Sequence, residues 1–159
     1  MSSRSSSNKT GPVVFRGLLV SREDIRKNAE KAQDEIDLIL NQEEITYPFL
    51  RDHLRRFVQI QYHLSPLDLE ETDDLDKLTL ISLSKALHVS RELIADYEAG
   101  QNCEGATSAT VKRSLLLMKI QKALSVELSL QELMGIDTLE DVVHAIWAHL
   151  RVPGEVSQR

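Results

Sequence analysis

The residues whose types and spacing come closest to a chemical task lie in the segment 78–101, LTLISLSKALHVSRELIADYEAGQ. The segment predicts two short helices, and a helix that enters the major groove of DNA presents its first turns to the base edges. Four residues at the start of the second helix are candidates for base contacts: Ser90, Arg91, Glu92 and Ala95. Candidates for phosphate contacts are the basic residues Lys85, Lys112, Arg113 and, near the N-terminus, Arg4 and Lys9. These residues together predict a nucleic-acid-binding surface.

Two amphipathic helices joined by a tight turn must position these side chains. Thr79 is the predicted N-cap of the first helix, whose expected buried face repeats at spacings of three and four residues: Leu80, Leu83, Ala86 and Leu87. His88 and Val89 form the predicted turn. Ser90 is expected to cap the second helix, because its side-chain oxygen can accept a backbone N–H of the new first turn. The residues expected to be buried on the second helix are Leu93, Ile94 and Tyr97, and Gly100 is its expected end.

The charge of this region favours a second hypothesis. Between residues 65 and 104, ten acidic residues stand against three basic ones, a local charge of −7 in a chain whose net charge is −6. Since affinity for DNA depends on Lys and Arg, an acidic scaffold is better suited to a basic protein partner. The candidate residues for that contact are Asp73, Asp74, Asp76, Glu92, Asp96 and Glu98.

The stretch 77–134 resembles two families of bacterial regulators. The positions that match repressors of the Xre type are Leu78, Thr79, Leu83, Lys85, Ala86, Leu87, Val89, Ser90, Arg91, Ile94, Tyr97, Glu98 and Gly100. The run IQKALSVELSLQEL at 120–133 is similar to the end of the MerR fold and of its chaperone-modulator relatives. The resemblance implies a helix-turn-helix transcription regulator that binds DNA, and it covers nothing before residue 77. The second helix nevertheless carries three acids where these families have basic or uncharged polar residues, and the loop at 102–108 lacks the basic residues of a MerR wing.

A third hypothesis comes from a resemblance to acyl and peptidyl carrier proteins. The sequence Gly105-Ala106-Thr107-Ser108, followed by a helix and by the run GIDTLEDVV at 135–143, is similar to the surroundings of the serine that carries phosphopantetheine. The resemblance implies Ser108 as the attachment site. Thr107 and Ala109 replace the aspartate and leucine of the carrier motif, and Lys112 and Arg113 stand where carriers are acidic.

Little else in the sequence indicates catalysis, a metal or a cofactor, so we expect no enzyme. The five histidines contain neither an HxxxH nor an HExxH pair: His53, His63, His88, His144 and His149. Cys103 is the only cysteine, which excludes an internal disulfide and fits a reducing compartment. No apolar run approaches the roughly 20 residues that span a bilayer. We therefore expect a cytoplasmic protein with no membrane contact.

Leucine, isoleucine and alanine recur at helical spacing through most of the chain, which predicts an all-α bundle around the helix-turn-helix. The predicted organisation is a flexible arm (1–20), a helical pair (21–64), the helix-turn-helix domain (65–152) and a tail (153–159). Polar caps mark the expected helix starts: Ser21, Ser65, Ser129 and, for the last helix, Thr138 or Asp137. A heptad seam in 25–39, or the C-terminal helix, is the predicted contact of a homodimer.

Overall fold

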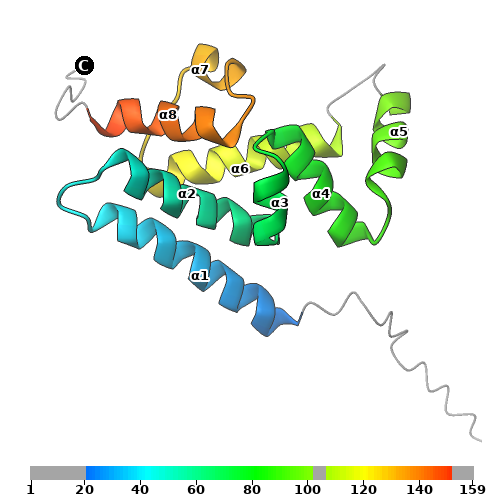
Figure 1. The fold of residues 1–159 in the computed structure, drawn as a ribbon, viewed down its shortest axis with the longest axis horizontal. Helices are drawn as coiled ribbons and strands as arrows, with labels where there is room; N and C mark the ends of the chain where they lie inside the picture. Colours follow the sequence, from blue (N-terminus) through cyan, green and yellow to red (C-terminus); the bar gives the residue numbers. More distant parts are fainter. Residues whose placement is uncertain (1–20, 102–106, 152–159) are drawn as a thin grey trace, which may run out of the picture.

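The computed structural model describes residues 21–101 and 107–151, and this part of the chain is helical throughout (Figure 1). Its helices are α1 (Arg22–Leu40), α2 (Tyr47–Gln61), α3 (Pro66–Glu71), α4 (Leu75–Leu87), α5 (Arg91–Gln101), α6 (Ser108–Leu124), α7 (Leu130–Met134) and α8 (Leu139–Leu150). The predicted all-α fold class is therefore confirmed. Within the two described ranges, no helix is long and apolar enough to cross a membrane.

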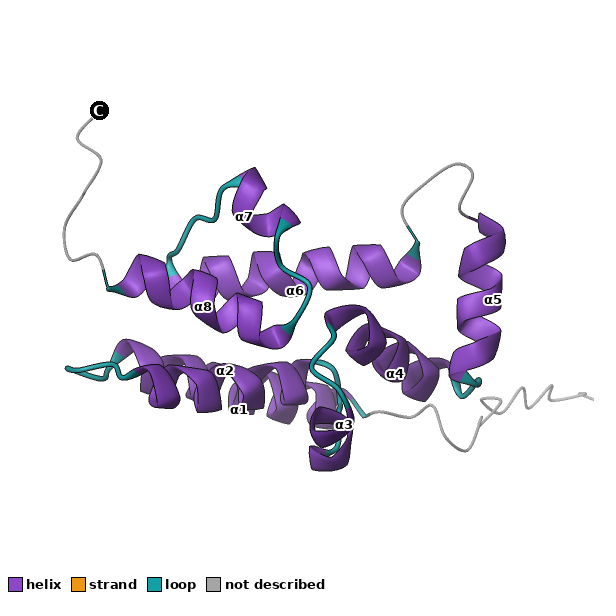
Figure 2. Ribbon diagram, turned by 45° about the horizontal axis from the view of Figure 1, so that its top comes forward, coloured by secondary structure: helices purple, strands orange, loops and turns teal. Residues whose placement is uncertain are grey.

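Long helices form the body of the molecule, and the short helices α3 and α7 lie against it. Helices α1 and α2 lie side by side and carry α6 and α8 on one side (Figures 1 and 2). Helix α4 packs against α6, while α5 stands at the end of the molecule with α4 as its main neighbour. The short α7 rises above α6 and α8 in both views.

Local hydrogen bonds explain where most helices begin. The N-caps of α1, α3, α7 and α8 are Ser21, Ser65, Ser129 and Thr138, and each forms a reciprocal capping box with the acidic residue three positions later. Such a box satisfies two backbone N–H groups that the first helical turn leaves unpaired. The predicted caps are confirmed, with Thr138 as the cap of α8.

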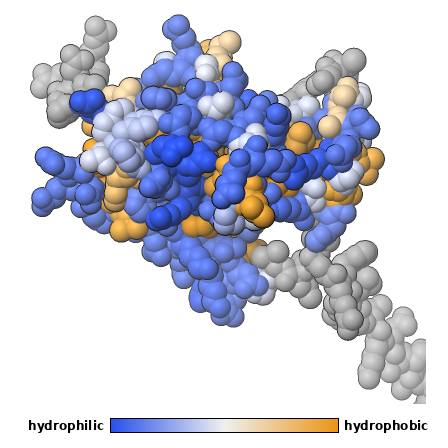
Figure 3. All heavy atoms as spheres, viewed as in Figure 1, coloured by the Kyte–Doolittle hydropathy of each residue, from blue (hydrophilic) through white to orange (hydrophobic). Residues whose placement is uncertain are grey.

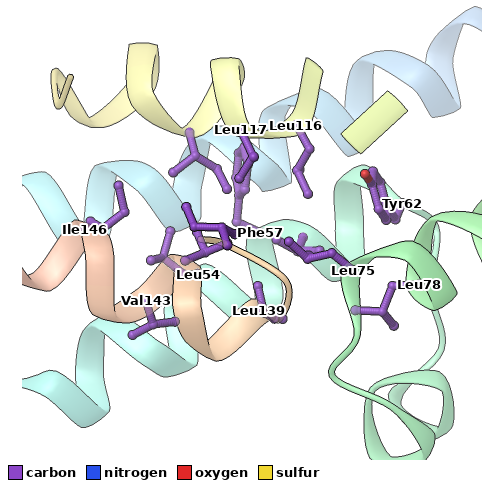
Figure 4. Close-up of a cluster of buried hydrophobic side chains, with 14 of the residues drawn as sticks. Leu54, Phe57, Tyr62, Leu75, Leu78, Leu116, Leu117, Leu139, Val143 and Ile146 are labelled. Carbon is purple, nitrogen blue, oxygen red and sulfur yellow. The ribbon is translucent and has the colours of Figure 1, made fainter. Parts of the chain in front are cut away.

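One continuous cluster of buried side chains joins α1, α2, α4, α6 and α8 (Figure 4). The helices α1 and α8 contribute their apolar faces to it: Ala32, Ile36 and Ile39 from α1, and Leu139, Val142, Val143 and Ile146 from α8. The faces predicted to form a homodimer are thus buried in the chain's own core. The N-terminal part of the predicted seam, Ile25 and Ala29, is exposed.

A junction of backbone and side-chain hydrogen bonds ties the N-terminus of α4 to that of α8. The backbone N–H of Leu75 donates to the carbonyl of Asp137 (3.0 Å), and that of Leu139 donates to the carbonyl of Asp73 (2.8 Å). The Asp73 carboxylate also accepts the N–H of Glu140 (3.0 Å) and pairs with Arg55 of α2. We call residues 73–75 and 137–140 the α4–α8 junction.

The junction explains why α4 begins earlier than predicted. Asp74 is its N-cap and accepts the N–H of Lys77 (2.9 Å), so the predicted cap, Thr79, lies inside the helix. The Thr79 hydroxyl is buried and donates to the carbonyl of Leu75 (2.6 Å). The prediction placed the cap five residues too late because a buried threonine and a capping threonine look alike in a sequence.

The predicted buried face of α4 is also wrong. Its buried residues are Leu75, Leu78, Thr79, Ile81 and Ser82, whereas Leu80 and Leu83 are half-buried and Ala86 and Leu87 are exposed. The two hydroxyl groups can enter the core because the residue that caps the C-terminus of α2 is their partner: Thr79 bonds to the hydroxyl of Tyr62 (3.2 Å), and Ser82 donates to the carbonyl of Tyr62 (2.8 Å). These bonds offset the cost of burying polar groups, and they rotate the helix away from its most apolar stripe.

The core predicts one clear effect on stability. Leu54 of α2 is completely buried, so Leu54→Ala should lower the free energy of unfolding by about 2–5 kcal/mol through lost burial and a cavity. Urea unfolding followed by circular dichroism measures the change. The matched control is Leu38→Ala on α1, where half of the side chain is exposed and the loss should be well below that of Leu54→Ala.

Candidate functional site

Helices α4 and α5 are joined by residues 88–90, the place where the sequence predicts the turn. His88 caps α4 in the left-handed conformation (φ 54°), and its N–H donates to the carbonyl of Ser84. The Ser90 hydroxyl oxygen accepts the N–H of Leu93 (3.2 Å), which is the capping contact predicted for it. Gly100, the predicted end of α5, lies within the helix, which extends to Gln101.

The basic side chains of α4 and α5 that are predicted to contact DNA form ion pairs with acidic side chains of α3. Lys85 is hydrogen-bonded to the carboxylate of Asp68, and Arg91 Nη1 lies 3.1 Å from a carboxylate oxygen of Glu71. Both acids belong to α3, which packs against α4. These two cations therefore pair with an acidic helix of their own chain, although Arg91 stays exposed, as do Ser90, Glu92 and Ala95, the other residues of the predicted base-reading group.

Asp68 binds Lys85 firmly because the carboxylate is buried and is also hydrogen-bonded to Ser65. One of its carboxylate oxygens accepts the backbone N–H (2.7 Å) and the hydroxyl (2.9 Å) of Ser65, and the same oxygen meets Lys85. Burial by itself raises the pKa of Asp68, but the bonds from Lys85 and Ser65 outweigh it, and the pKa lies below its usual value. The carboxylate thus stays charged and paired at neutral pH.

The two candidate phosphate contacts on α6 are engaged elsewhere. Arg113 pairs with Asp76 (2.9 Å) and lies 3.7 Å from Asp137, and it also donates to the carbonyl of Ile136. The ammonium group of Lys112 lies over the ring of Tyr62, 5.2 Å from its centre, and burial lowers the pKa of Lys112. The predicted cations therefore do not form a band beside α5. Arg4 and Lys9 lie outside the described residues, as does Cys103.

Most residues of the predicted acidic face also have structural partners. Asp73 and Asp74 belong to the α4–α8 junction, Asp76 pairs with Arg113, and Glu98 accepts the N–H of Ala109 (2.9 Å). Glu92 and Asp96, both exposed on α5, remain. Four of the six acids predicted to form one binding face therefore make contacts within the chain instead.

Helix α5 exposes apolar side chains that the sequence predicts to be buried. Ile94 is buried, but Leu93 is 58% exposed and Tyr97 is 67% exposed. Hydrophobic atoms accordingly gather over α5 on the face seen in Figure 3. Helix α5 contributes little to the core, because it buries one large apolar side chain, Ile94, and packs mainly against α4.

Exposed apolar side chains of two neighbouring helices line a groove between α6 and α7. Its volume is about 490 Å³. Its apolar walls are Leu117, Met118, Leu130, Leu133 and Met134, and polar residues stand at its edge: Asp76, Thr110, Arg113, Ser114 and Gln121. Met118, Leu130 and Met134 are 61%, 74% and 76% exposed, which is unusual for three such side chains beside one groove.

Helix α7 is short, and it is held in place by its own cap and by α8. Glu132 accepts the backbone N–H of Ser129 (2.7 Å) and is paired with His149 of α8 (2.8 Å). These two bonds, the first being the stronger influence, lower the pKa of Glu132 to about 2. The wall of the groove formed by α7 is thus held by its own cap and by the contact with His149 of α8.

The described residues contain no group of three or more His, Asp or Glu side chains arranged to hold a metal ion. Ser108, the candidate attachment site of a carrier protein, is the first residue of α6 and is exposed. Thr107 caps the helix, and its side chain accepts the N–H of Thr110 (3.1 Å).

Comparison with known proteins gives no relative: no family model, no curated protein and no solved structure matches the chain. The assignment of a candidate site therefore depends on the geometry alone.

The groove was missed by the sequence analysis, although α6 carries a signal for it. Its apolar residues occur on more than one side of the helix: Val111, Leu115, Leu116, Leu117, Met118 and Ile120. A helix buried on one face can cover only some of these, and the structure leaves Val111, Leu115 and Met118 exposed, of which Met118 lines the groove. An excess of apolar residues around a helix indicates a second neighbour.

The Asp68 contact predicts a pH-dependent stability. Asp68→Ala should lower the free energy of unfolding by about 2 kcal/mol near neutral pH, because α3 loses its capping box and Lys85 its partner. The folded-state pKa is depressed below the ordinary value of 3.8. The stabilisation is therefore complete above that value and is lost as the pH falls through the folded-state pKa.

Urea unfolding at neutral pH and at about pH 3 tests this, and the gap between wild type and Asp68→Ala should narrow in acid. Asp34→Ala, which removes an exposed acid of α1, is the matched control and should leave both curves nearly unchanged. An equal gap at the two pH values would contradict the prediction.

Proposed function

We propose that the protein is a protein-interaction module that binds an amphipathic helix of a partner in the groove between α6 and α7. The observation that carries the proposal is the exposure of Met118, Leu130 and Met134 along a groove of about 490 Å³. Water-exposed apolar side chains that line one concave surface gain most from a partner that covers them.

The lining of the groove favours a helical ligand. Two helices form its walls, and a ligand helix with apolar residues at positions i, i+3, i+4 and i+7 presents one stripe to such a groove. Methionine side chains adapt to ligands of different shape, because they are unbranched and polarizable. Asp76 and Arg113, which are paired with each other, form a polar edge beside these apolar walls.

The resemblance to Xre and MerR regulators implies that the protein binds DNA. The charges of the described residues favour a protein partner instead. Of the candidate phosphate contacts within the described residues, Lys85 and Arg113 are paired with Asp68 and Asp76, and Lys112 lies over Tyr62. Arg91 is paired with Glu71 in the same way. Binding DNA through these residues would first require breaking contacts within the chain, and the counterion release that drives such binding needs free cations.

A display library of amphipathic helices tests the proposal against the intact chain. We expect enriched peptides with apolar residues at helical spacing, and binding at least about tenfold weaker for Met118→Glu and Met134→Glu, because each change places a charge in the apolar wall. Fluorescence anisotropy of a labelled peptide measures the affinities. Binding of a labelled DNA duplex at low salt is measured in parallel and should be absent.

The matched control is Leu38→Glu, which adds the same charge at an exposed leucine of α1, away from the groove. It should bind peptides as the wild type does. Peptides that bind the groove variants and wild type equally, or a salt-dependent affinity for the duplex that exceeds peptide affinity, would contradict the proposal.

A carrier protein is the second candidate, and the position of Ser108 favours it. The serine is exposed at the first position of α6, and the groove begins two residues further along the same helix, at Thr110. A phosphopantetheine arm attached to the Ser108 hydroxyl would place an apolar cargo beside the groove.

Intact-mass measurement tests this candidate. After incubation with coenzyme A and a broad-specificity phosphopantetheinyl transferase, a carrier gains the mass of one phosphopantetheine group. Ser108→Ala should then gain nothing. An unchanged mass of the wild type would remove the carrier candidate and leave the protein-interaction proposal standing.

A further inference from the structure

A second cavity lies at the other end of α8, away from the groove. It has a volume of about 550 Å³ and opens between the loop that precedes α2 and the C-terminal end of α8. Its walls include Tyr47 and Trp147, and Glu43, Glu44 and Arg151 stand around it. We call it the α8-end pocket, and its argument does not depend on the groove.

The two aromatic rings of this pocket are held in fixed positions. The rings of Tyr47 and Trp147 meet edge to face, with centres 5.7 Å apart and planes at 83°. The Tyr47 hydroxyl donates to the carboxylate of Glu140, and burial together with this bond raises the pKa of Tyr47 to about 12. The Tyr47 ring is therefore a neutral, anchored wall at any physiological pH.

One cation already occupies the face of the tryptophan ring. The guanidinium carbon of Arg151 lies 5.3 Å from the centre of the Trp147 ring, a distance typical of a cation–π contact. Arg151 forms no ion pair with an acid of the described residues. The ring face thus accepts a guanidinium group, although its present occupant gains nothing from the carboxylates nearby.

The charges around the pocket favour an additional or replacing cation. Glu43 and Glu44 are exposed, and neither takes part in an ion pair within the described part of the chain. The pocket also lies at the C-terminal end of α8, where the helix dipole places partial negative charge. An incoming cation can meet the Trp147 face and the two carboxylates, whereas Arg151 meets only the ring.

We propose that the α8-end pocket binds an arginine side chain of a basic peptide, with Arg151 as the residue that the ligand replaces on Trp147. A planar guanidinium group stacks on an aromatic face and at the same time donates in-plane hydrogen bonds to carboxylates. The tetrahedral ammonium group of lysine matches only the electrostatic part of this arrangement. The pocket therefore prefers arginine to lysine.

The sole tryptophan of the chain, Trp147, lines this pocket, so its fluorescence reports binding there. The intact chain is titrated with acetyl-Arg-Arg-amide, and acetyl-Lys-Lys-amide and the citrulline analogue serve as the lysine and uncharged comparisons. We expect a saturable change for the arginine peptide, a weaker affinity for the lysine peptide and none for citrulline.

Two variants with opposite expected effects make the test specific. Replacing both acids, Glu43→Gln with Glu44→Gln, should weaken binding by about four- to twentyfold, as expected for the loss of two exposed ion pairs. Arg151→Ala should tighten binding by about two- to fivefold, because it removes both a competitor for the ring and a like charge. Neither change touches the core, so both variants should remain folded.

The matched control is Glu92→Gln with Asp96→Asn, which removes two exposed acids from α5 and should leave the affinity unchanged. The proposal is overturned if the citrulline peptide binds as well as the arginine peptide, or if the control and the Glu43/Glu44 variant lose affinity equally. It is also overturned if Arg151→Ala weakens binding, since Arg151 would then be part of the site. A titration with the arginine peptide that does not saturate would also overturn the proposal.

Discussion

The α4–α8 junction is the contact on which the arrangement of the helices depends. Two backbone hydrogen bonds, Leu75 to Asp137 and Leu139 to Asp73, bring two helix N-termini together that are more than sixty residues apart in the chain. Helix N-termini carry partial positive charge and repel each other. The Asp73 carboxylate lies between them, where it caps Glu140 and binds Arg55, and this negative charge makes the close approach favourable.

The same need for negative charge explains the acidic composition of the middle of the chain. Asp68 caps α3 and holds Lys85, Asp74 caps α4, Asp76 pairs with Arg113 and Glu98 caps the start of α6. Their charges are neutralised by helix ends and by cations of the same chain. Many of the acids behind the local charge of −7 thus serve to join the helices, and they do not by themselves indicate an acidic binding surface.

Helix α8 connects the two surfaces to which we assign binding. Its N-terminus is fixed at the junction, His149 near its end holds Glu132 of α7, and Trp147 forms a wall of the α8-end pocket. Because the apolar face of α8 is completely buried against the core, the helix provides a rigid base for both α7 and the pocket. Under our proposals the groove binds apolar side chains and the pocket a cation, so a basic amphipathic peptide has features that suit each of them.

The sequence by itself determined where several helices begin and which face of α8 is buried. Ser21, Ser65, Ser129 and Thr138 cap their helices through bonds that span only three residues, and the buried residues of α8 recur at helical spacing. Local contacts of this kind require no knowledge of the rest of the chain. Only the tertiary structure decided the roles of Thr79, Leu93 and Tyr97, because burial of a side chain depends on which neighbour covers it. It also decided that Lys85 and Arg91 meet the acids of α3, since an ion pair between distant segments is set by packing and leaves no periodic pattern in the sequence.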